Sequence, residues 1–159
     1  MAIAVVGMLD EREEGLQLIK DHIEKRGHRS VLIAITIGTG AIEPSLKPAI
    51  DCHALAKSGG TTIEKVREML VKERDKATAM MADGLGKILQ EHHHAGELQG
   101  IIAVGGMTGT FISLSAMKLL PFGVPKLLIS SVAAMPAYAK KLAEFFGVRD
   151  VTVMHSVVD

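Results

Sequence analysis

The feature that most constrains the fold is a short apolar run, Ile101–Val104, which passes through glycines into the pattern of an amphipathic helix. The run is partly β-branched and is bounded by turn residues, which is typical of a strand buried on both faces of a parallel sheet. The glycines that follow it permit a tight turn with positive φ and leave no Cβ in the path of a ligand. We expect a helix over 111–120, with Thr108 or Thr110 as its N-cap.

The turn between this strand and its helix predicts an anion site. A strand end, a glycine turn and a helix start present backbone N–H groups and the positive end of a helix dipole, and phosphate is the usual anion bound there. The pattern Gly-Gly-Met-Thr-Gly-Thr over 105–110 is neither the dinucleotide fingerprint nor a Walker loop. A tight strand-to-helix connection without a ligand therefore stays an open alternative.

Apolar runs of strand length alternate with helical patterns along the whole chain. Such alternation indicates a parallel sheet with helices on both faces and right-handed crossovers. We therefore predict a single α/β domain over 1–159, a Rossmann-like three-layer sandwich with about five parallel strands in the order 2-1-3-4-5. Strands are expected at Ile3–Val6, Ser30–Ile37, Ile101–Val104, Pro125–Ile129 and Val151–Met154, and helices between Asp10 and Gly27, over 61–91 as one helix or two, over 111–120 and over 135–146.

Two of the helix starts have the spacing of a capping box. Asp10 and Glu13 predict that Asp10 caps the first helix, and Thr61 and Glu64 predict a cap for the long helical stretch. Before that stretch, the segment 50–56 is consistent with either a short strand or a helical turn.

The long helical stretch contains two further features. Gly84 and Gly86 lower its helix propensity but allow a neighbouring element to approach closely. The run His92–His94 follows near its end. Adjacent helical residues point about 100° apart, so three in a row do not converge on one metal ion, whereas histidine near a helix C-terminus is electrostatically favourable.

The predicted topology gathers one set of residues at one edge of the sheet, because all parallel strands end there. Ligands of such sheets bind outside these carboxyl ends, at the switch point between strands one and three. Lys126 begins its strand, so it is assigned to the opposite edge. The candidate ligand-binding residues at the carboxyl edge are Gly7, Asp10, Gly38, Thr39, Gly105, Gly106, Met107, Thr108, Gly109, Thr110, Ser130 and Ser131.

Composition excludes several classes of function. Eighteen basic residues balance eighteen acidic ones, so no net field attracts nucleic acid or an anionic membrane. Aromatic residues make up only 3% with no tryptophan, which argues against base-stacking platforms. Cys52 is the single cysteine, and the apolar start of the chain is too short for a signal peptide or a membrane span. We expect a cytoplasmic protein with no nucleic-acid or membrane partner.

An enzymatic role has little support in the sequence. There is no G-x-S-x-G elbow, no Ser-His-Asp signature and no cluster with metal-ligand spacing, so catalytic and metal-binding residues are not assigned. Cys52 and His53 form a candidate reactive pair, but sequence neighbours rarely face each other. Whether the protein is an enzyme stays open.

Four motifs carry a family resemblance when taken together and in order: Gly7-Met-Leu-Asp10, the turn 105–110, Leu120-Pro-Phe-Gly-Val-Pro-Lys-Leu127 and Met154-His-Ser-Val-Val-Asp159. Over nearly its whole length, the chain resembles the ATP-binding domain family of the tomato mosaic virus resistance protein and its prokaryotic relatives. The resemblance implies two Rossmann-like subdomains, of which this chain is similar to the first only. It also implies binding of ATP with Mg²⁺, and self-association.

The chain departs from the family pattern in both loops. The family's first loop typically reads Gly-Thr-Leu-Asp-Thr-Lys-Gly, and Arg12 stands here in place of its lysine as a candidate phosphate contact. The nearby glutamates add negative charge that repels a polyphosphate. The second loop of the family typically reads Gly-Gly-Ser-Gly-Gly-Thr. Met107 and Thr108 have larger side chains than the residues they replace and narrow the space at this loop. The departures are Met8, Glu11, Arg12, Glu13, Met107 and Thr108.

Two functions follow as hypotheses. The first is a nucleotide-binding module for ATP, with phosphates held by the turn 105–110 and with Asp10 either capping the first helix or helping to hold Mg²⁺ through water. The alternative is an assembly subdomain, without a ligand of its own, that uses its 48% hydrophobic content to form a homo-oligomer or to dock a separate second subdomain.

Overall fold

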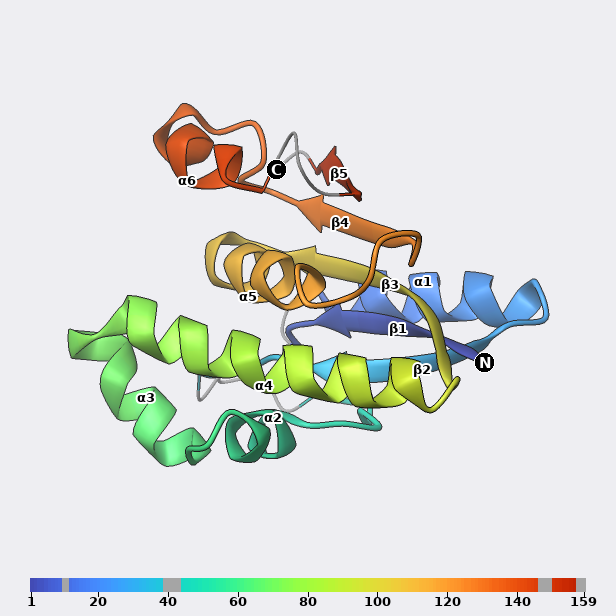
Figure 1. Cartoon of the computed structure of the whole chain (residues 1–159), viewed down its shortest axis with the longest axis horizontal. Coiled ribbons are helices and arrows are strands. Elements are labelled where there is room, and N and C mark those ends of the chain that lie inside the picture. The colour runs from blue at the N-terminus through green and yellow to red at the C-terminus, as the bar shows by residue number, and fades with distance from the viewer. Residues whose placement is uncertain (10–11, 39–43, 146–149, 157–159) are drawn as a thin grey trace.

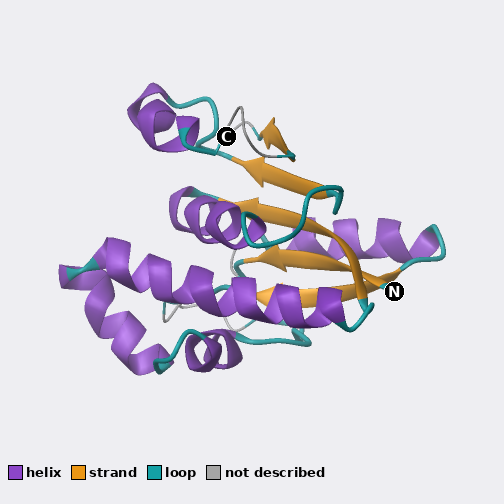
Figure 2. Ribbon diagram, viewed as in Figure 1, coloured by secondary structure: helices purple, strands orange, loops and turns teal. Residues whose placement is uncertain are grey.

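The computed structural model describes residues 1–9, 12–38, 44–145 and 150–156. Its strands form one parallel sheet in the order β2-β1-β3-β4-β5, with helices on both faces (Figures 1 and 2), which confirms the predicted α/β architecture and strand order. The strands are β1 (Ala2–Gly7), β2 (Arg29–Ala34), β3 (Leu98–Gly105), β4 (Lys126–Ser130) and β5 (Val151–His155).

The strands differ from their predicted bounds mainly at their ends. The strand β3 begins at Leu98 rather than Ile101, because Leu98 and Gly100 also pair with β1. Gly100 suggested a turn, yet a Cβ at this position would lie only 3.2 Å from the Pro125 carbonyl oxygen, so the glycine serves close packing within the sheet. The strand β2 ends at Ala34, although the next residue still donates a hydrogen bond to the Gly7 carbonyl.

Helices cover the two faces of the sheet unequally (Figure 1). On one face, α1 (Glu13–Lys25) packs against β1 and β2. The other face is covered by α4 (Arg74–His94) and α5 (Met107–Met117), and two shorter helices, α2 (Cys52–Ser58) and α3 (Ile63–Lys72), pack against α4. The remaining elements are the 3-10 turn η1 (Pro136–Tyr138) and α6 (Ala139–Ala143).

Glycines bring the helices of the larger layer into close contact, as the sequence predicted. A Cβ added to Gly84 would lie 1.9 Å from the Leu55 carbonyl oxygen, so α4 lies directly against the backbone of α2. A Cβ on Gly86 would lie 2.4 Å from Leu119 Cδ1. The atom that a Cβ on Gly84 would meet belongs to the backbone, whereas the atom near Gly86 is the tip of a side chain. For that reason Gly84 should tolerate a larger residue less well than Gly86.

The capping-box prediction for α3 is wrong, and the one for α1 involves Asp10, which lies outside the described residues. Helix α1 begins at Glu13, with Arg12 in the N-cap position. The Glu13 carboxylate instead accepts hydrogen bonds from the Leu46 backbone N–H and from Ser45 Oγ, which hold the pKa of Glu13 below its usual value. For α3 the cap is one residue later than predicted.

The hydroxyl that caps α3 belongs to Thr62, which accepts a hydrogen bond from the Lys65 N–H at 3.4 Å. The long helical stretch divides into α3 and α4 at Glu73, whose φ of −136° leaves the helical region. For the segment 50–56, the two alternatives of a short strand and a helical turn are each right in part. Ile50 forms a bridge to β2, and Asp51 then caps α2.

Two helices near the carboxyl edge also differ from prediction. Helix α5 begins at Met107, four residues before the predicted start, so Thr108 and Thr110 lie inside it and neither is its N-cap. The segment predicted as one helix over 135–146 contains η1 followed by α6, because Pro136 opens a separate 3-10 turn. Residue 146 lies outside the described part of the chain.

Candidate functional site

The turn from β3 into α5 is built for close backbone contact. A Cβ on Gly105 would lie 2.7 Å from both the Gly109 carbonyl carbon and the Thr110 nitrogen, so the strand end rests on the first turn of the helix. Gly106 is the N-cap residue with φ −77°. The predicted positive φ at this turn is therefore wrong, because the turn uses glycine for space and not for left-handed backbone.

The first turn of α5 points unpaired backbone amides toward the carboxyl edge of the sheet. The first intrahelical bond runs from the Thr110 N–H to the Gly106 carbonyl at 2.8 Å, so the N–H groups of Met107, Thr108 and Gly109 have no partner at i−4. Among the described residues, no side-chain hydrogen bond caps this helix. Together with the helix dipole, these amides form an electropositive surface suited to an anion.

Arg12 and Ser131 meet this surface at Gly106. The position of a Cβ on Gly106 lies 3.4 Å from Arg12 Nη2 and 3.7 Å from Ser131 Oγ. The guanidinium comes from the connection after β1, and the hydroxyl follows β4. Three segments far apart in sequence thus bring a cation, a hydroxyl and open amides together at one edge of the sheet.

Thr110 and Ser130 act beneath this surface, not on it. Both side chains are fully buried. The Thr110 hydroxyl lies 2.7 Å from Ser130 Oγ and donates to the Gly105 carbonyl at 3.3 Å, while Ser130 Oγ accepts from the Val132 N–H at 3.2 Å. These two predicted site residues therefore position the turn by joining β3, α5 and β4.

Of the remaining predicted residues, one packs inside the fold, one lies on the surface and two are outside the described residues. Gly7 is buried, and a Cβ there would lie 2.6 Å from Leu16 Cδ2, so this glycine seats α1 on the sheet. Gly38 is exposed, with no atom within 4 Å of a Cβ. Asp10 and Thr39 lie outside the described residues.

Thr36 and Arg67, which were not among the predicted site residues, organise the loops at this edge. The Leu9 N–H donates to Thr36 Oγ1 at 2.8 Å, which ties the connection after β1 to the end of β2. Arg67 on α3 donates from Nε to the Ile37 carbonyl at 2.9 Å. A lone threonine within the apolar run 31–37 was the available signal for the first, whereas nothing local to Arg67 indicates its partner 30 residues away.

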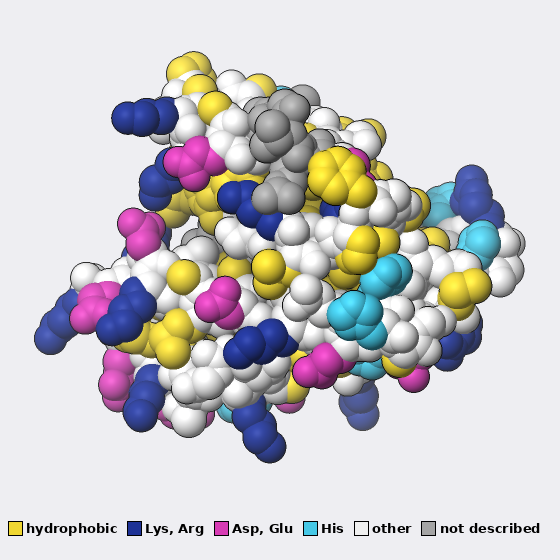
Figure 3. Space-filling view, in the orientation of Figure 1, with side chains coloured by type: hydrophobic (Ala, Val, Ile, Leu, Met, Phe, Trp, Pro, Cys, Tyr) yellow, Lys and Arg dark blue, Asp and Glu magenta, His cyan; other side chains and the backbone are white. Residues whose placement is uncertain are grey.

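A cleft of about 440 Å³ adjoins the first turn of α5. It lies between α4, α5 and the η1–α6 segment, at the left of the view in Figure 3. Met107 and Thr108 line the side next to the turn, and Phe111 and Tyr138 line the interior with ring centroids 6.3 Å apart. The cleft also has three basic residues and one acidic residue, namely Arg74, Lys140, Lys141 and Asp75, of which the last two form an ion pair at 3.5 Å.

Two other groups of candidate residues have structural partners. His92 Nδ1 lies 2.6 Å from a Glu97 carboxylate oxygen, and His93 Nδ1 lies 3.3 Å from the Leu98 carbonyl oxygen at the end of α4. Burial raises the pKa of the Cys52 thiol, and the neighbouring Asp51 raises it further, so little thiolate is present at neutral pH. The thiol therefore has the protonation state of an unreactive cysteine.

Within the described ranges, no three histidine, cysteine, aspartate or glutamate side chains are grouped as they would be around a metal ion. The helices of those same ranges are also too short or too polar to cross a membrane.

The chain matches, over residues 1–159, the model of the N-terminal domain of an uncharacterised protein family, UPF0261. It is 36% identical over 160 residues to a UPF0261 protein of Clostridium tetani, covering 99% of this chain and 36% of that protein. It is 32% identical to a UPF0261 protein of Brucella suis, covering 82% and 30% respectively. It is 31% identical to the ToMV resistance protein Tm-1(GCR237) of tomato, covering 71% and 13%. The chain thus spans about a third of the length of these bacterial relatives.

Proposed function

The chain belongs to the UPF0261 family, as its N-terminal domain, and from that premise we propose that it binds a nucleotide of the ATP type through the turn 105–110. The observation that carries the proposal is the convergence of Arg12, Ser131 and the open amides of α5 on Gly106. The switch point of a doubly wound sheet is where such folds bind ligands.

The residues at this edge fit a phosphate group. The backbone amides at the start of α5 supply donors, Gly106 lacks a side chain that would block them, and the Arg12 guanidinium matches phosphate oxygens in charge and geometry. Glu13, in the first turn of α1, already accepts two hydrogen bonds from the segment 45–46. Its negative charge is therefore partly compensated.

Magnesium enters this proposal only with the nucleotide. A bound Mg²⁺ ion would neutralise phosphate charge, and it usually retains several waters and takes one or two carboxylates from the protein. Asp10 is the carboxylate that the sequence offers for that role, and it lies outside the described residues. The chain's own contribution, in the described residues, is to hold the phosphate oxygens by amides and the guanidinium.

The cleft beside α5 offers room for the nucleoside part of the ligand. Met107 and Thr108 border both the turn and the cleft, so a molecule anchored at the amides extends directly into it. Phe111 and Tyr138 give the cleft an apolar interior, and its basic residues exceed its acidic ones. These properties favour an anionic ligand with a flat apolar portion over a bare phosphate.

Replacing Arg12 with alanine should weaken ATP binding by about 10- to 100-fold, because a hydrogen bond to a charged group contributes about 1.5–3 kcal/mol. Isothermal titration with ATP and Mg²⁺, ADP and AMP measures the effect. Arg26→Ala is the matched control, because Arg26 lies at the other end of the same helix and its guanidinium forms hydrogen bonds with His22 of that helix.

The titration also tests the proposal as a whole. The control variant should keep the affinity of the unmodified protein. Absence of both binding heat and a thermal shift at millimolar nucleotide would contradict nucleotide binding. Equal affinities of the Arg12→Ala and unmodified proteins would place the ligand elsewhere.

A further inference from the structure

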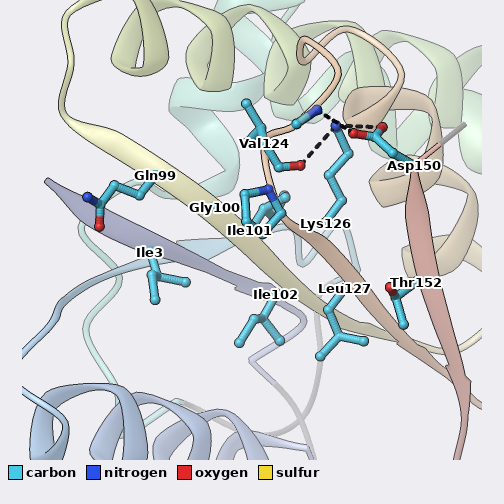
Figure 4. Close-up of a pocket in the computed structure, with 12 residues that line it drawn as sticks. Ile3, Gln99, Gly100, Ile101, Ile102, Val124, Lys126, Leu127, Asp150 and Thr152 are labelled. Atoms are coloured by element: carbon cyan, nitrogen blue, oxygen red, sulfur yellow. Dashed lines mark hydrogen bonds and ion pairs between the residues drawn. The ribbon is translucent and has the colours of Figure 1, made fainter.

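One face of the sheet is apolar, and the described residues cover only half of it. On the side of α1, the paired residues Ile102, Leu127 and Thr152 form a row across β3, β4 and β5, and all three project to the same side in Figure 4. A second row continues it through the partly exposed Val104 and Ile129 to Met154, which is 53% exposed. Central strands of parallel sheets normally have both faces covered.

The side chains of β4 show how incomplete this face is. Leu128, which points the other way, is fully buried in the large core. Leu127 and Ile129 are partly exposed and belong to neither of the two hydrophobic clusters of the described residues. The smaller cluster, between α1 and the sheet, reaches only as far as Ile102 and Val104 on β3.

A groove of about 650 Å³ lies where β3, β4 and β5 begin, and Ile102, Leu127 and Thr152 are among the residues that line it. Lys126 Nζ donates to the Pro121 carbonyl at 2.8 Å, to the Val124 carbonyl at 3.0 Å and to Asp150 Oδ1 at 2.8 Å (Figure 4). All three ammonium protons are used in this way. The groove therefore offers apolar surface and no unpaired charge from Lys126, which suits an aliphatic helix better than a polar small molecule.

Topology explains why this face is open. Right-handed crossovers place the helices that follow β3 and β4 on the face opposite α1. Helix α1 covers β1 and β2, and a helix about 10 Å wide does not reach β4 or β5, since neighbouring strands lie about 4.8 Å apart. A further element is needed beside α1.

We propose that this groove is the docking site for an amphipathic helix from the polypeptide that, in the longer relatives, follows the domain described here. Those bacterial relatives are about three times the length of the matched region, and the match is to the family's N-terminal domain. The strand β5 is the last in the order of the chain and lies at the open edge of the sheet. A polypeptide leaving its carboxyl end and turning back passes over β5, β4 and β3.

Thiol labelling tests this proposal. In a Cys52→Ser background, Thr152→Cys places a thiol on the groove and Glu68→Cys places a control thiol on the exposed side of α3. Labelling rates are compared between this chain and the same chain extended by the part of the Clostridium tetani protein that follows the matched region. The extension should slow labelling at Thr152→Cys by roughly tenfold or more and leave Glu68→Cys unchanged, because only the groove becomes buried.

A second variant keeps the test decisive. Leu127→Glu should leave the urea midpoint of the 159-residue chain unchanged, because Leu127 is outside both clusters, and should abolish protection in the extended chain. Equal labelling of Thr152→Cys in a cooperatively folding extended chain overturns the proposal. The proposal is also overturned if labelling of Thr152→Cys slows in the 159-residue chain alone as its concentration rises, because the groove is then occupied by a second copy. Unfolding of the Leu127→Glu chain also overturns it, by showing that the face belongs to this domain's own core.

Discussion

Replacing Gly84 with alanine should lower the free energy of unfolding by about 3 kcal/mol, the upper end of the usual cost of overpacking. The added Cβ would lie 1.9 Å from the Leu55 carbonyl oxygen and 2.9 Å from the Gly59 nitrogen. Both neighbours are backbone atoms, so no side-chain rotation relieves the overlap and the two helices must separate. Urea denaturation followed by circular dichroism measures the loss.

Gly86→Ala is the matched control in the same helix. Both substitutions gain about 1 kcal/mol of helix propensity in a helix interior. At Gly86, however, the Cβ meets Leu119 Cδ1, the tip of a side chain that is 42% exposed and can turn toward solvent. The control should therefore change stability by less than about 1 kcal/mol. Equal losses for the two variants would contradict the backbone-contact argument.

The second large effect is expected at the ion pair between Lys126 and Asp150. The Lys126 side chain is only 1% exposed, whereas that of Asp150 is 29% exposed. Asp150→Asn removes the charge that compensates a buried ammonium, which should cost about 2 kcal/mol, below the cost of breaking a fully buried pair because Asp150 is partly solvated. Asp83→Asn is a control on the exposed surface of α4 and should change stability by less than about 0.5 kcal/mol.

The same pair predicts a pH dependence. The hydrogen bond from Lys126 holds the pKa of the Asp150 carboxyl below its usual value, with a further contribution from the Gly123 N–H. A lowered pKa in the folded state stabilises the protein above the unfolded pKa of about 3.9 and ceases to do so as the pH falls through the folded value. Urea midpoints should therefore fall more steeply below about pH 4 in the unmodified protein than in Asp150→Asn. Parallel curves would show that the carboxyl does not titrate in this way.

The fold was largely predictable because its signals are local. Short apolar runs such as Ile101–Val104, alternating with helical patterns, identify buried strands, and the right-handed crossover rule then restricts their order. The helix starts were less predictable, since capping depends on tertiary partners. Glu13 has the spacing of a capping box with Asp10, but its carboxylate is bound by Ser45 and Leu46, about 30 residues further along the chain.

The location of the candidate site at the sheet edge could be predicted from the sequence, but the orientation of its side chains could not. Its edge follows from topology, and Gly106 and Arg12 were predicted from the sequence as candidate residues there. That Thr110 and Ser130 would turn inward could not be predicted, because both hydroxyls look equally available in the sequence. The cleft was also missed, since it is lined by residues from α4 to α6 whose proximity exists only in the folded chain.

Some glycines of this chain are needed for their backbone conformation and others for close packing, and the two kinds should differ in how easily other residues replace them. Gly27 and Gly96, at the ends of α1 and α4, have φ of 80° and 71° with open space around a Cβ. Asparagine adopts that backbone at modest cost, so related genes can drift there. Gly105 has no such freedom, because any side chain collides with the following helix. Among homologues, the first class of glycine should alternate with asparagine, while Gly105 should be retained.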